Sequence, residues 1–295
     1  MRVLLWRQAE ADAETAWGII MCNSLNHTLT SREALLPMGA ATVRVVLTTV
    51  CVVLISMAFS ACRPSGDKGR IPAAAEIAPI LLFNGAGASP GDVSALEKIL
   101  SRAHLNYLTV NSPRLNGMSE SNIRAYRLLI VPGGNFEQLG DSLTSSTAMN
   151  IRNAIRNGLS YLGICAGAFL AGNSPYNGLN LTSGLRYEFY AAEARGIRKA
   201  AVAITAAGGQ TLDQYWEDGP QLSGWGVVVG KYPDGTAAVA EGTFGSGWVI
   251  LTGFHPEAPA SWRRGMDFRT SVNIDNAYAA TLIRAALNRD LLPHY

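Results

Sequence analysis

Residues 161–169 read YLGICAGAF, a stretch that places Cys165 between Gly163 and Gly167. Strand-forming residues precede the cysteine and helix-forming residues follow it, which predicts a nucleophile elbow, a sharp strand-to-helix turn that exposes its central side chain. Side chains at the two flanking positions would collide with the neighbouring strand and helix, and glycine removes those collisions. A helix dipole there would also stabilise the thiolate. The alternative is that Cys165 is a small buried hydrophobe.

Short apolar runs alternate with helical patterns on the N-terminal side of the elbow. Strands are expected at residues 78–83, 105–110, 127–131 and 161–164, and helices at 93–103 and 144–157. This alternation predicts an α/β fold with a doubly wound, mostly parallel sheet. Beyond the elbow we expect shorter strands at 200–206, 227–232, 236–241 and 248–253, a hairpin turn at 233–235 and a closing helix at 276–287.

A Phe-His-Pro-Glu motif at residues 254–257 follows the last predicted strand. Ligand sites of open α/β sheets gather at the carboxyl ends of strands, so His255 is placed to take the proton of the Cys165 thiol. Glu257, two residues later, is the candidate to orient the imidazole and fix its tautomer. The alternatives are a histidine in a surface loop and a solvated carboxylate. The predicted triad is therefore Cys165, His255 and Glu257.

A Pro-Gly-Gly-Asn sequence at residues 132–135 ends the third predicted strand. The unhindered N–H groups of Gly133 and Gly134, together with the amide of Ala166, could form an oxyanion hole beside the elbow. A plain strand-terminating turn is an equally good interpretation of these glycines.

Taken in order, the three motifs resemble the class I glutamine amidotransferase superfamily. The surrounding text (VPGGN, YLGICAGAFLAG, GFHPEAP) is most similar to the domain at the N-terminus of eukaryotic biotin-protein ligases, which also occurs as stand-alone bacterial proteins. The resemblance covers residues 78–290. It implies a flavodoxin-like sandwich in which Cys165 attacks, His255 acts as base and acid, Glu257 orients it, and Gly133 and Gly134 supply the oxyanion hole.

The sequence departs from that pattern in two ways. Glutaminases of the superfamily usually read Gly-x-Cys-x-Gly-x-Gln, whereas this chain has Phe169 at the last position, which puts glutamine as the substrate in doubt. A Gly-Arg-Gly-Arg-x-Gly loop, the nucleotide and biotin signature of the ligase catalytic domain, does not occur in the sequence, so we expect no biotin-ligase activity from this chain by itself.

Four residues are candidates for a substrate pocket: Asn135, Phe169, Tyr215 and Trp216. The two aromatic residues at 215 and 216 belong to a Tyr-Trp-Glu-Asp-Gly-Pro segment that we expect to form a turn at the mouth of the pocket. An ordinary solvated turn with Trp216 half buried is at least as good an interpretation.

The N-terminal segment predicts export. A short basic region and an apolar run ending in Ser-Ala-Cys make residues 38–61 a secretory signal peptide of lipoprotein type, with Cys62 as the lipidated residue. The alternative is an uncleaved transmembrane anchor. Residues 1–37 are a leader that is not certain to be translated, 62–76 a tether, and 77–295 the folded domain. The expected location is the bacterial cell envelope, with the membrane as a partner through this segment.

Composition narrows the function classes. The chain has 295 residues, 48% of them hydrophobic, and a net charge of +2 without a basic stripe, so no nucleic acid partner is expected. We expect no metal or other cofactor. The favoured function is an extracytoplasmic amidase or amidotransferase-like hydrolase that acts on a small or peptide-like amide through a thioester at Cys165. The main alternative is a binding module that keeps the pocket without turnover, and a weaker one is a glutaminase subunit that feeds ammonia to a partner.

Overall fold

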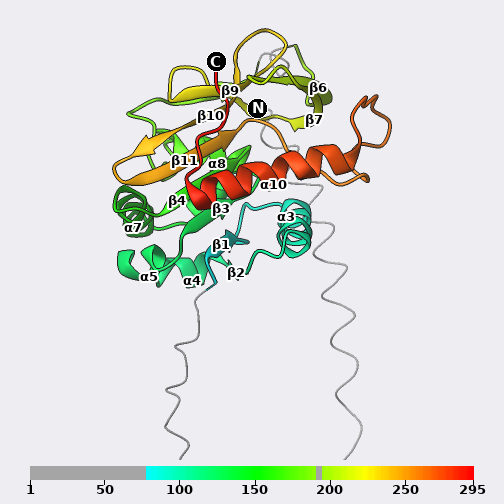
Figure 1. Ribbon diagram of the computed structural model, residues 1–295. Coiled ribbons are helices and arrows are strands. Elements are labelled where there is room, and N and C mark those ends of the chain that lie inside the picture. Colours follow the sequence, from blue (N-terminus) through cyan, green and yellow to red (C-terminus); the bar gives the residue numbers. More distant parts are fainter. Residues whose placement is uncertain (1–77, 191–194) are drawn as a thin grey trace, which may run out of the picture. The chain divides into compact units, whose positions relative to one another are not determined.

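The computed structural model describes residues 78–190 and 195–295. The predicted signal peptide, the predicted tether and Cys62 lie outside these residues. A nine-stranded sheet is made by β1 (Ile80–Phe83), β2 (Tyr107–Val110), β3 (Leu128–Val131), β4 (Ser160–Ile164), β6 (Lys199–Ala206), β7 (Thr211–Glu217), β9 (Val227–Lys231), β10 (Ala237–Phe244) and β11 (Gly247–Thr252). Its strand order is β2-β1-β3-β4-β11-β10-β9-β6-β7 (Figure 1). A separate small sheet pairs β5 (Glu188–Phe189) with β8 (Pro220–Gln221).

The large sheet has a parallel half and an antiparallel half. Strands β2, β1, β3, β4 and β11 pair in parallel, and β11, β10, β9, β6 and β7 continue the sheet in antiparallel fashion. Every residue of β1, β3 and β4 is buried, because helices cover both faces of the parallel half. This explains why those strands read as continuous apolar runs, and it confirms the predicted doubly wound α/β fold.

Seven helices of the described residues surround the sheet. They are α3 (Pro90–Arg102), α4 (Ser112–Asn116), α5 (Glu120–Arg124), α6 (Phe136–Asp141), α7 (Ser145–Arg156), α8 (Ala166–Ala171) and α10 (Val272–Asn288). Helices α3 and α10 lie on one face, and α4, α5 and α7 lie on the other (Figure 1). None of the helices in the described residues has the length and apolarity needed to cross a bilayer.

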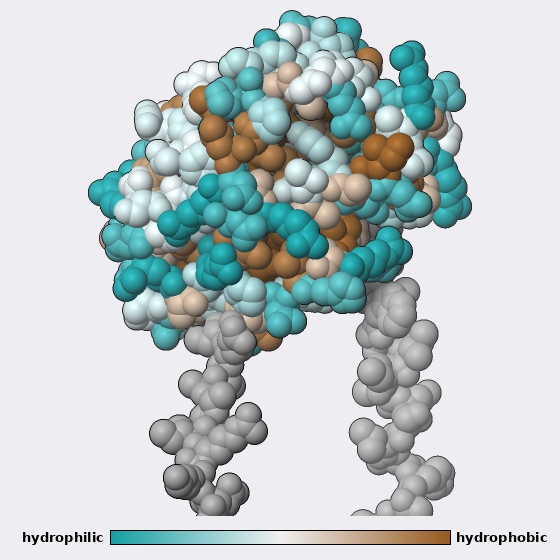
Figure 2. Space-filling view, in the orientation of Figure 1, coloured by the Kyte–Doolittle hydropathy of each residue, from teal (hydrophilic) through white to brown (hydrophobic). Residues whose placement is uncertain are grey.

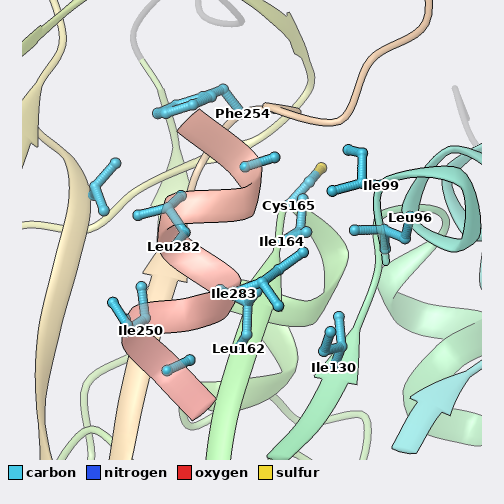
Figure 3. Close-up of a cluster of buried hydrophobic side chains, with 14 of the residues drawn as sticks. Leu96, Ile99, Ile130, Leu162, Ile164, Cys165, Ile250, Phe254, Leu282 and Ile283 are labelled. Carbon is cyan, nitrogen blue, oxygen red and sulfur yellow. The ribbon is translucent and has the colours of Figure 1, made fainter. Parts of the chain in front are cut away.

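Strand alternation divides the core between the two faces. Ile130, Leu162 and Ile164 pack with α3 and α10, as the close-up in Figure 3 shows. Leu129 and Val131 flank Ile130 along β3. Their side chains point to the opposite face of the sheet and pack with α7 and α8. On the outside, the face drawn in Figure 2 shows apolar residues in separate patches among polar ones.

The fold brings four loops to one edge of the sheet. Parallel strands present their carboxyl ends at the same edge, where ligand sites of such folds lie. Here β1 leads to the start of α3, β3 leads to Gly133, β4 leads to Cys165, and β11 leads to His255. Segments far apart in sequence therefore meet around the cysteine.

Candidate active site

Cys165 occupies a strained turn between β4 and α8. Its φ is 47° and its ψ is −101°, a conformation that costs a non-glycine residue on the order of 1–3 kcal/mol. Its backbone N–H donates to the Thr252 carbonyl of β11 at 2.9 Å, which ties the turn to the sheet. Figure 3 shows the side chain beyond Ile164 at the end of the strand, with its sulfur directed away from that residue. This backbone geometry is that of a nucleophile elbow.

The two elbow glycines sit where no Cβ fits. A Cβ on Gly163 would lie 2.6 Å from the Gly167 carbonyl oxygen, and a Cβ on Gly167 would lie 2.1 Å from the Val131 carbonyl oxygen. Both contacts are with backbone, which cannot rotate aside as a side chain can. The close passage of the elbow between β3 and β4 therefore requires glycine at both positions.

His255 is the centre of a buried polar cluster. Its backbone N–H donates to the Tyr215 carbonyl oxygen at 2.8 Å, and its ring is enclosed. The ring atom Nδ1 lies 2.7 Å from Asp92 Oδ1 and 3.1 Å from Glu257 Oε1. The Cys165 side chain lies near enough to the imidazole to affect its charge, and its Sγ donates to the Glu217 carbonyl oxygen at 3.5 Å. Since Nδ1 faces the two carboxylates, Nε2 is the atom left for the thiol, and the structure brings the three residues of the predicted triad together.

Charge in this cluster favours an imidazolium. Burial lowers the pKa of His255, but the Asp92 carboxylate and the Cys165 side chain outweigh it and raise that pKa well above its usual value. In general, an imidazolium stabilises a negatively charged sulfur beside it, and that is the nucleophilic form of a thiol.

Asp92 was missed by sequence reasoning. It lies in the first turn of α3, is 2% exposed, and is closer to His255 Nδ1 than Glu257 is. Its sequence context, Ser-Pro-Gly-Asp directly after a buried strand, predicts a helix start, in which an acidic residue at the third position is ordinary. The signal that could have revealed it is its position at the carboxyl edge of the sheet.

The two carboxylates respond differently to burial. Burial raises the pKa of Asp92, but the charge of His255 and hydrogen bonds with His255, Glu257 and Ser89 outweigh this and bring it to about 2. Burial raises the pKa of Glu257 to about 8, and the nearby Asp92 charge adds to the rise. At neutral pH Asp92 is therefore ionised and Glu257 is protonated.

Asp92, His255 and Glu257 also resemble a metal site, since one ligand atom of each lies within 4.8 Å of the others. Atoms bound to one tetrahedral zinc ion, each about 2.0–2.2 Å from the metal, stand roughly 3.3 Å apart. The Asp92–His255 separation of 2.7 Å is shorter than that and has the length of a direct charge-assisted hydrogen bond. The cluster is thus arranged for hydrogen bonding.

The predicted oxyanion-hole residues lie around this cluster. A Cβ on Gly133 would be 2.4 Å from His255 Cε1, so that glycine borders the imidazole directly. Gly134 has a φ of 140°, and a Cβ there would collide with the Gly87 carbonyl oxygen. Among the hydrogen bonds of residues 78–190 and 195–295, none is donated to a protein acceptor by the N–H of Gly133, Gly134 or Ala166. All three predicted backbone donors thus remain available near the elbow.

Of the four candidate pocket residues, Trp216 was predicted wrongly. Residues 211–217 form β7 rather than a turn, and alternation along the strand turns Trp216 into the core, where it is 0% exposed and donates to the Gly219 carbonyl. It therefore does not line a pocket mouth. Tyr215, its neighbour, packs against the His255 ring with a centroid distance of 5.8 Å.

The other two candidates have structural partners. Asn135 accepts a hydrogen bond from the Gln138 N–H and caps α6, which occupies its side-chain carbonyl. Phe169 stacks on Phe136 at 4.7 Å and meets Phe189 edge-on at 5.1 Å. An aromatic cluster therefore stands where glutaminases carry glutamine.

Trp262 is a further aromatic residue that the sequence did not indicate. Its ring packs on His255 and Tyr215, and it lies 2.6 Å from where a Cβ on Gly91 would be. It covers the imidazole from the loop that follows the His-Pro-Glu motif. Cys165 itself is only 5% exposed, so the site is closed in this structure.

Replacing Gly133 by alanine is expected to slow iodoacetamide labelling of Cys165 at pH 6 by about tenfold or more. The new methyl group would overlap His255 Cε1 and Asp92 Oδ1, so the imidazole must leave its position. Gly208→Ala is the matched control, because no atom lies within 4 Å of its added Cβ. Labelling of Gly133→Ala at the wild-type rate would show that the imidazole does not need this position.

The fold and this site define an α/β protein with a mostly parallel central sheet and a cysteine at a nucleophile elbow. Residues 78–197 match the family described as biotin-protein ligase, N terminal, which confirms the predicted resemblance over that range. No curated protein matches the sequence significantly.

Several solved structures resemble this one at low identity. A glutamine amidotransferase is 18% identical, with 61% of this chain and 90% of that chain covered and a TM-score of 0.48. A putative GMP synthase protein from Thermoplasma acidophilum is 13% identical, with coverages of 70% and 94% and a TM-score of 0.41. An exo-β-1,4-mannosidase from Opitutaceae bacterium strain TAV5 is 13% identical, with a TM-score of 0.42. The match covers 71% of this chain but only 36% of the mannosidase, so this chain spans about a third of that protein's length.

Proposed function

We propose that this chain is a cysteine-nucleophile hydrolase or amidotransferase-like enzyme that cleaves an amide through a thioester at Cys165. The observation that carries the proposal is the strained backbone of Cys165 together with the position of its side chain beside His255, whose imidazole is held by two carboxylates. A cysteine that served only as core filling would need neither the positive φ nor a buried histidine held by carboxylates.

In the proposed reaction the Cys165 thiolate attacks the amide carbonyl carbon and forms a C–S bond, while the carbonyl oxygen takes up the negative charge. Collapse of this tetrahedral intermediate breaks the C–N bond, and the amine leaves with the proton of His255 Nε2. Water then gives a proton to His255 and attacks the thioester, and the C–S bond breaks to release the acid. An amine in place of water would give amide transfer.

The oxyanion would be stabilised by backbone N–H groups. Those of Gly133, Gly134 and Ala166 have no protein acceptor among the described residues, and Gly133 also borders the imidazole. Loss of one such donor typically costs about 10²- to 10³-fold in rate. The substrate in this proposal is a small or peptide-like amide other than glutamine, since Phe169 offers the site an apolar ring instead of an amide.

The proposed location is the bacterial cell envelope. The support comes from sequence alone: the apolar run and the small residues before Cys62 are typical of a lipoprotein signal. In this proposal the lipid on Cys62 would hold the domain at the membrane surface, and the substrate would be an envelope amide.

A second candidate is a binding module without turnover. The observation that favours it is the closure of the site by Trp262, Tyr215 and the Phe169 cluster, which leaves Cys165 almost unexposed. On this view the pocket would hold a ligand or partner, and the elbow would be a feature kept from enzymes of the same fold.

The two candidates are separated by acylation with p-nitrophenyl acetate as a probe. The enzyme proposal predicts that the full chain acquires an acetyl group on Cys165, detected by peptide mass spectrometry, and releases p-nitrophenol in a burst. Cys165→Ala is expected to lower that release by at least about 100-fold, to the rate of the uncatalysed reaction. Equal release from Cys165→Ala and the wild type would sink the enzyme proposal and favour the binding module.

A further inference from the structure

Two carboxylates compete for one imidazole nitrogen. Asp92 Oδ1 lies 2.7 Å from His255 Nδ1, whereas Glu257 Oε1 lies 3.1 Å from the same atom. One N–H can be directed well at only one acceptor, and the shorter distance falls in the range of a charge-assisted bond. Asp92 is therefore the stronger partner of the imidazole, although Glu257 is the residue that the sequence motif suggests.

The second oxygen of Glu257 shows where a proton resides. Glu257 Oε2 is buried and accepts no hydrogen bond from any donor in the described residues. Its neighbour is the Asp92 carboxylate, since one oxygen of each carboxylate lies within 4.8 Å of the other and both residues face His255 Nδ1. Two ionised carboxylates this close in a buried site repel strongly, so one must hold a proton. A proton on Glu257 Oε2 would turn an unsatisfied oxygen into a donor to Asp92.

The surroundings favour the negative charge on Asp92 rather than on Glu257. Asp92 is the third residue of α3, where the helix dipole stabilises an anion, and its backbone N–H donates to the Ser89 hydroxyl that caps this helix. Glu257 has no helix terminus, and its partners among the described residues are His255 and Asp92. The proton therefore resides on Glu257.

We propose that Asp92 is the positioning residue that orients His255, and that a protonated Glu257 holds Asp92 in place by donating a hydrogen bond to it. This inference rests on the proposed function, because it assigns roles within the same site. Asp92 acts through His255 and touches no reacting atom. Glu257 then acts on Cys165 through Asp92 and His255, whereas the motif implies that it acts through His255 alone.

The first test compares Asp92→Asn with Glu257→Gln in the full chain. The probe is iodoacetamide, and labelling of the Cys165 peptide is followed by mass spectrometry from pH 5.5 to 9, since the sequence also contains Cys22, Cys51 and Cys62. Asp92→Asn removes the charge that stabilises the imidazolium and is expected to slow labelling about tenfold or more at pH 6, with convergence at high pH. Glu257→Gln keeps a donor and is expected to slow it only about two- to threefold.

Asp290→Asn, on an exposed residue at the end of α10, is the matched control for removing an aspartate charge. If Glu257→Gln slows labelling more than Asp92→Asn, Glu257 is the orienting residue and the inference is wrong, while the proposed function stands. If His255→Ala leaves labelling at the wild-type rate, Cys165 is not an activated nucleophile and the proposed function itself fails. A thermal melt of each variant excludes unfolding as the cause.

The second test detects the proton on Glu257 through the pH dependence of stability against urea. Burial raises the pKa of Glu257 from 4.5 to about 8, so between these values the native state holds a proton that the unfolded chain has lost. The native state is therefore destabilised as pH rises through this range, and the effect levels off above pH 8. Glutamine cannot titrate, so the urea midpoint of the wild type relative to Glu257→Gln is expected to fall from pH 5 to pH 8.

Other titrating groups near Glu257 are common to both proteins. They are Asp92 on α3, Cys165 at the elbow, His255 in its own loop and Tyr215 on β7. Burial raises the pKa of Tyr215, which stays neutral here, and Asp92 stays ionised. A midpoint difference that is constant between pH 5 and 8 would mean that Glu257 is ionised throughout, which overturns the inference even if Asp92→Asn folds poorly.

Discussion

His255→Ala is expected to slow iodoacetamide labelling of Cys165 at pH 6 by about 100-fold. An unassisted thiol with a pKa of about 8.5 is less than about 1% thiolate at that pH, whereas a neighbouring imidazolium keeps most of it ionised. The buried contact of His255 with Cys165, and its partnership with Asp92 and Glu257, supply that imidazolium. The rate is measured on the Cys165 peptide across pH 5.5 to 9.5, and the two proteins should converge near pH 9.5.

The same substitution should also remove general acid–base catalysis. Release of p-nitrophenol is expected to fall by about 10²- to 10⁴-fold, because neither departure of the leaving group nor attack by water would then be assisted. His294→Ala, on an exposed residue near the C-terminus, is the matched control and should behave as the wild type. A His255→Ala profile that overlays the wild type at every pH would contradict the role given to this residue.

The elbow was predictable because its sequence pattern is local. The glycines at 163 and 167 flank the cysteine within five residues, although the collision that requires Gly167 is with Val131 of the neighbouring strand β3. Continuous apolar runs likewise identified the parallel strands, since burial on both faces leaves no polar alternation. Local sequence is sufficient wherever the physical constraint is local.

Asp92 could not be found in this way. It lies 163 residues from His255 in sequence, and its local context predicts only a capped helix start. The contact depends on β1 and β11 delivering their following loops to the same edge of the sheet, which is a property of the whole topology. The prediction that Glu257 orients His255 has the same limit, because the competing carboxylate comes from another part of the chain.

Strand β7 was missed for a related reason. Its sequence, TLDQYWE, carries polar residues at Asp213 and Gln214, yet both are buried. Asp213 accepts from the Arg269 N–H, and the Gln214 side-chain amide donates to Asp275 of α10, so residues distant in sequence supply partners to both. Buried polar groups are tolerated where such partners exist. A polarity pattern cannot reveal partners that the tertiary fold supplies, and so Tyr215 and Trp216 were assigned to a turn.

Gly167→Ala is expected to destabilise the domain by roughly 3 kcal/mol, because overpacking a rigid site costs about that much. The added Cβ would lie 2.1 Å from the Val131 carbonyl oxygen and 3.1 Å from the Val131 Cβ, and β3 is held between β1 and β4. Relief requires α8 to move away from the sheet, which also displaces Cys165. Urea denaturation of the full chain measures the loss as a lower midpoint with an unchanged slope.

Gly208→Ala is the control for this substitution as well, since its Cβ meets no atom within 4 Å. It is expected to change stability by less than about 1 kcal/mol and in the stabilising direction, because alanine restricts the unfolded chain. A Gly167→Ala protein as stable as Gly208→Ala would mean that α8 can shift without cost. The elbow would then be looser than a fixed nucleophile requires, and the strained φ of Cys165 would lose its mechanistic meaning.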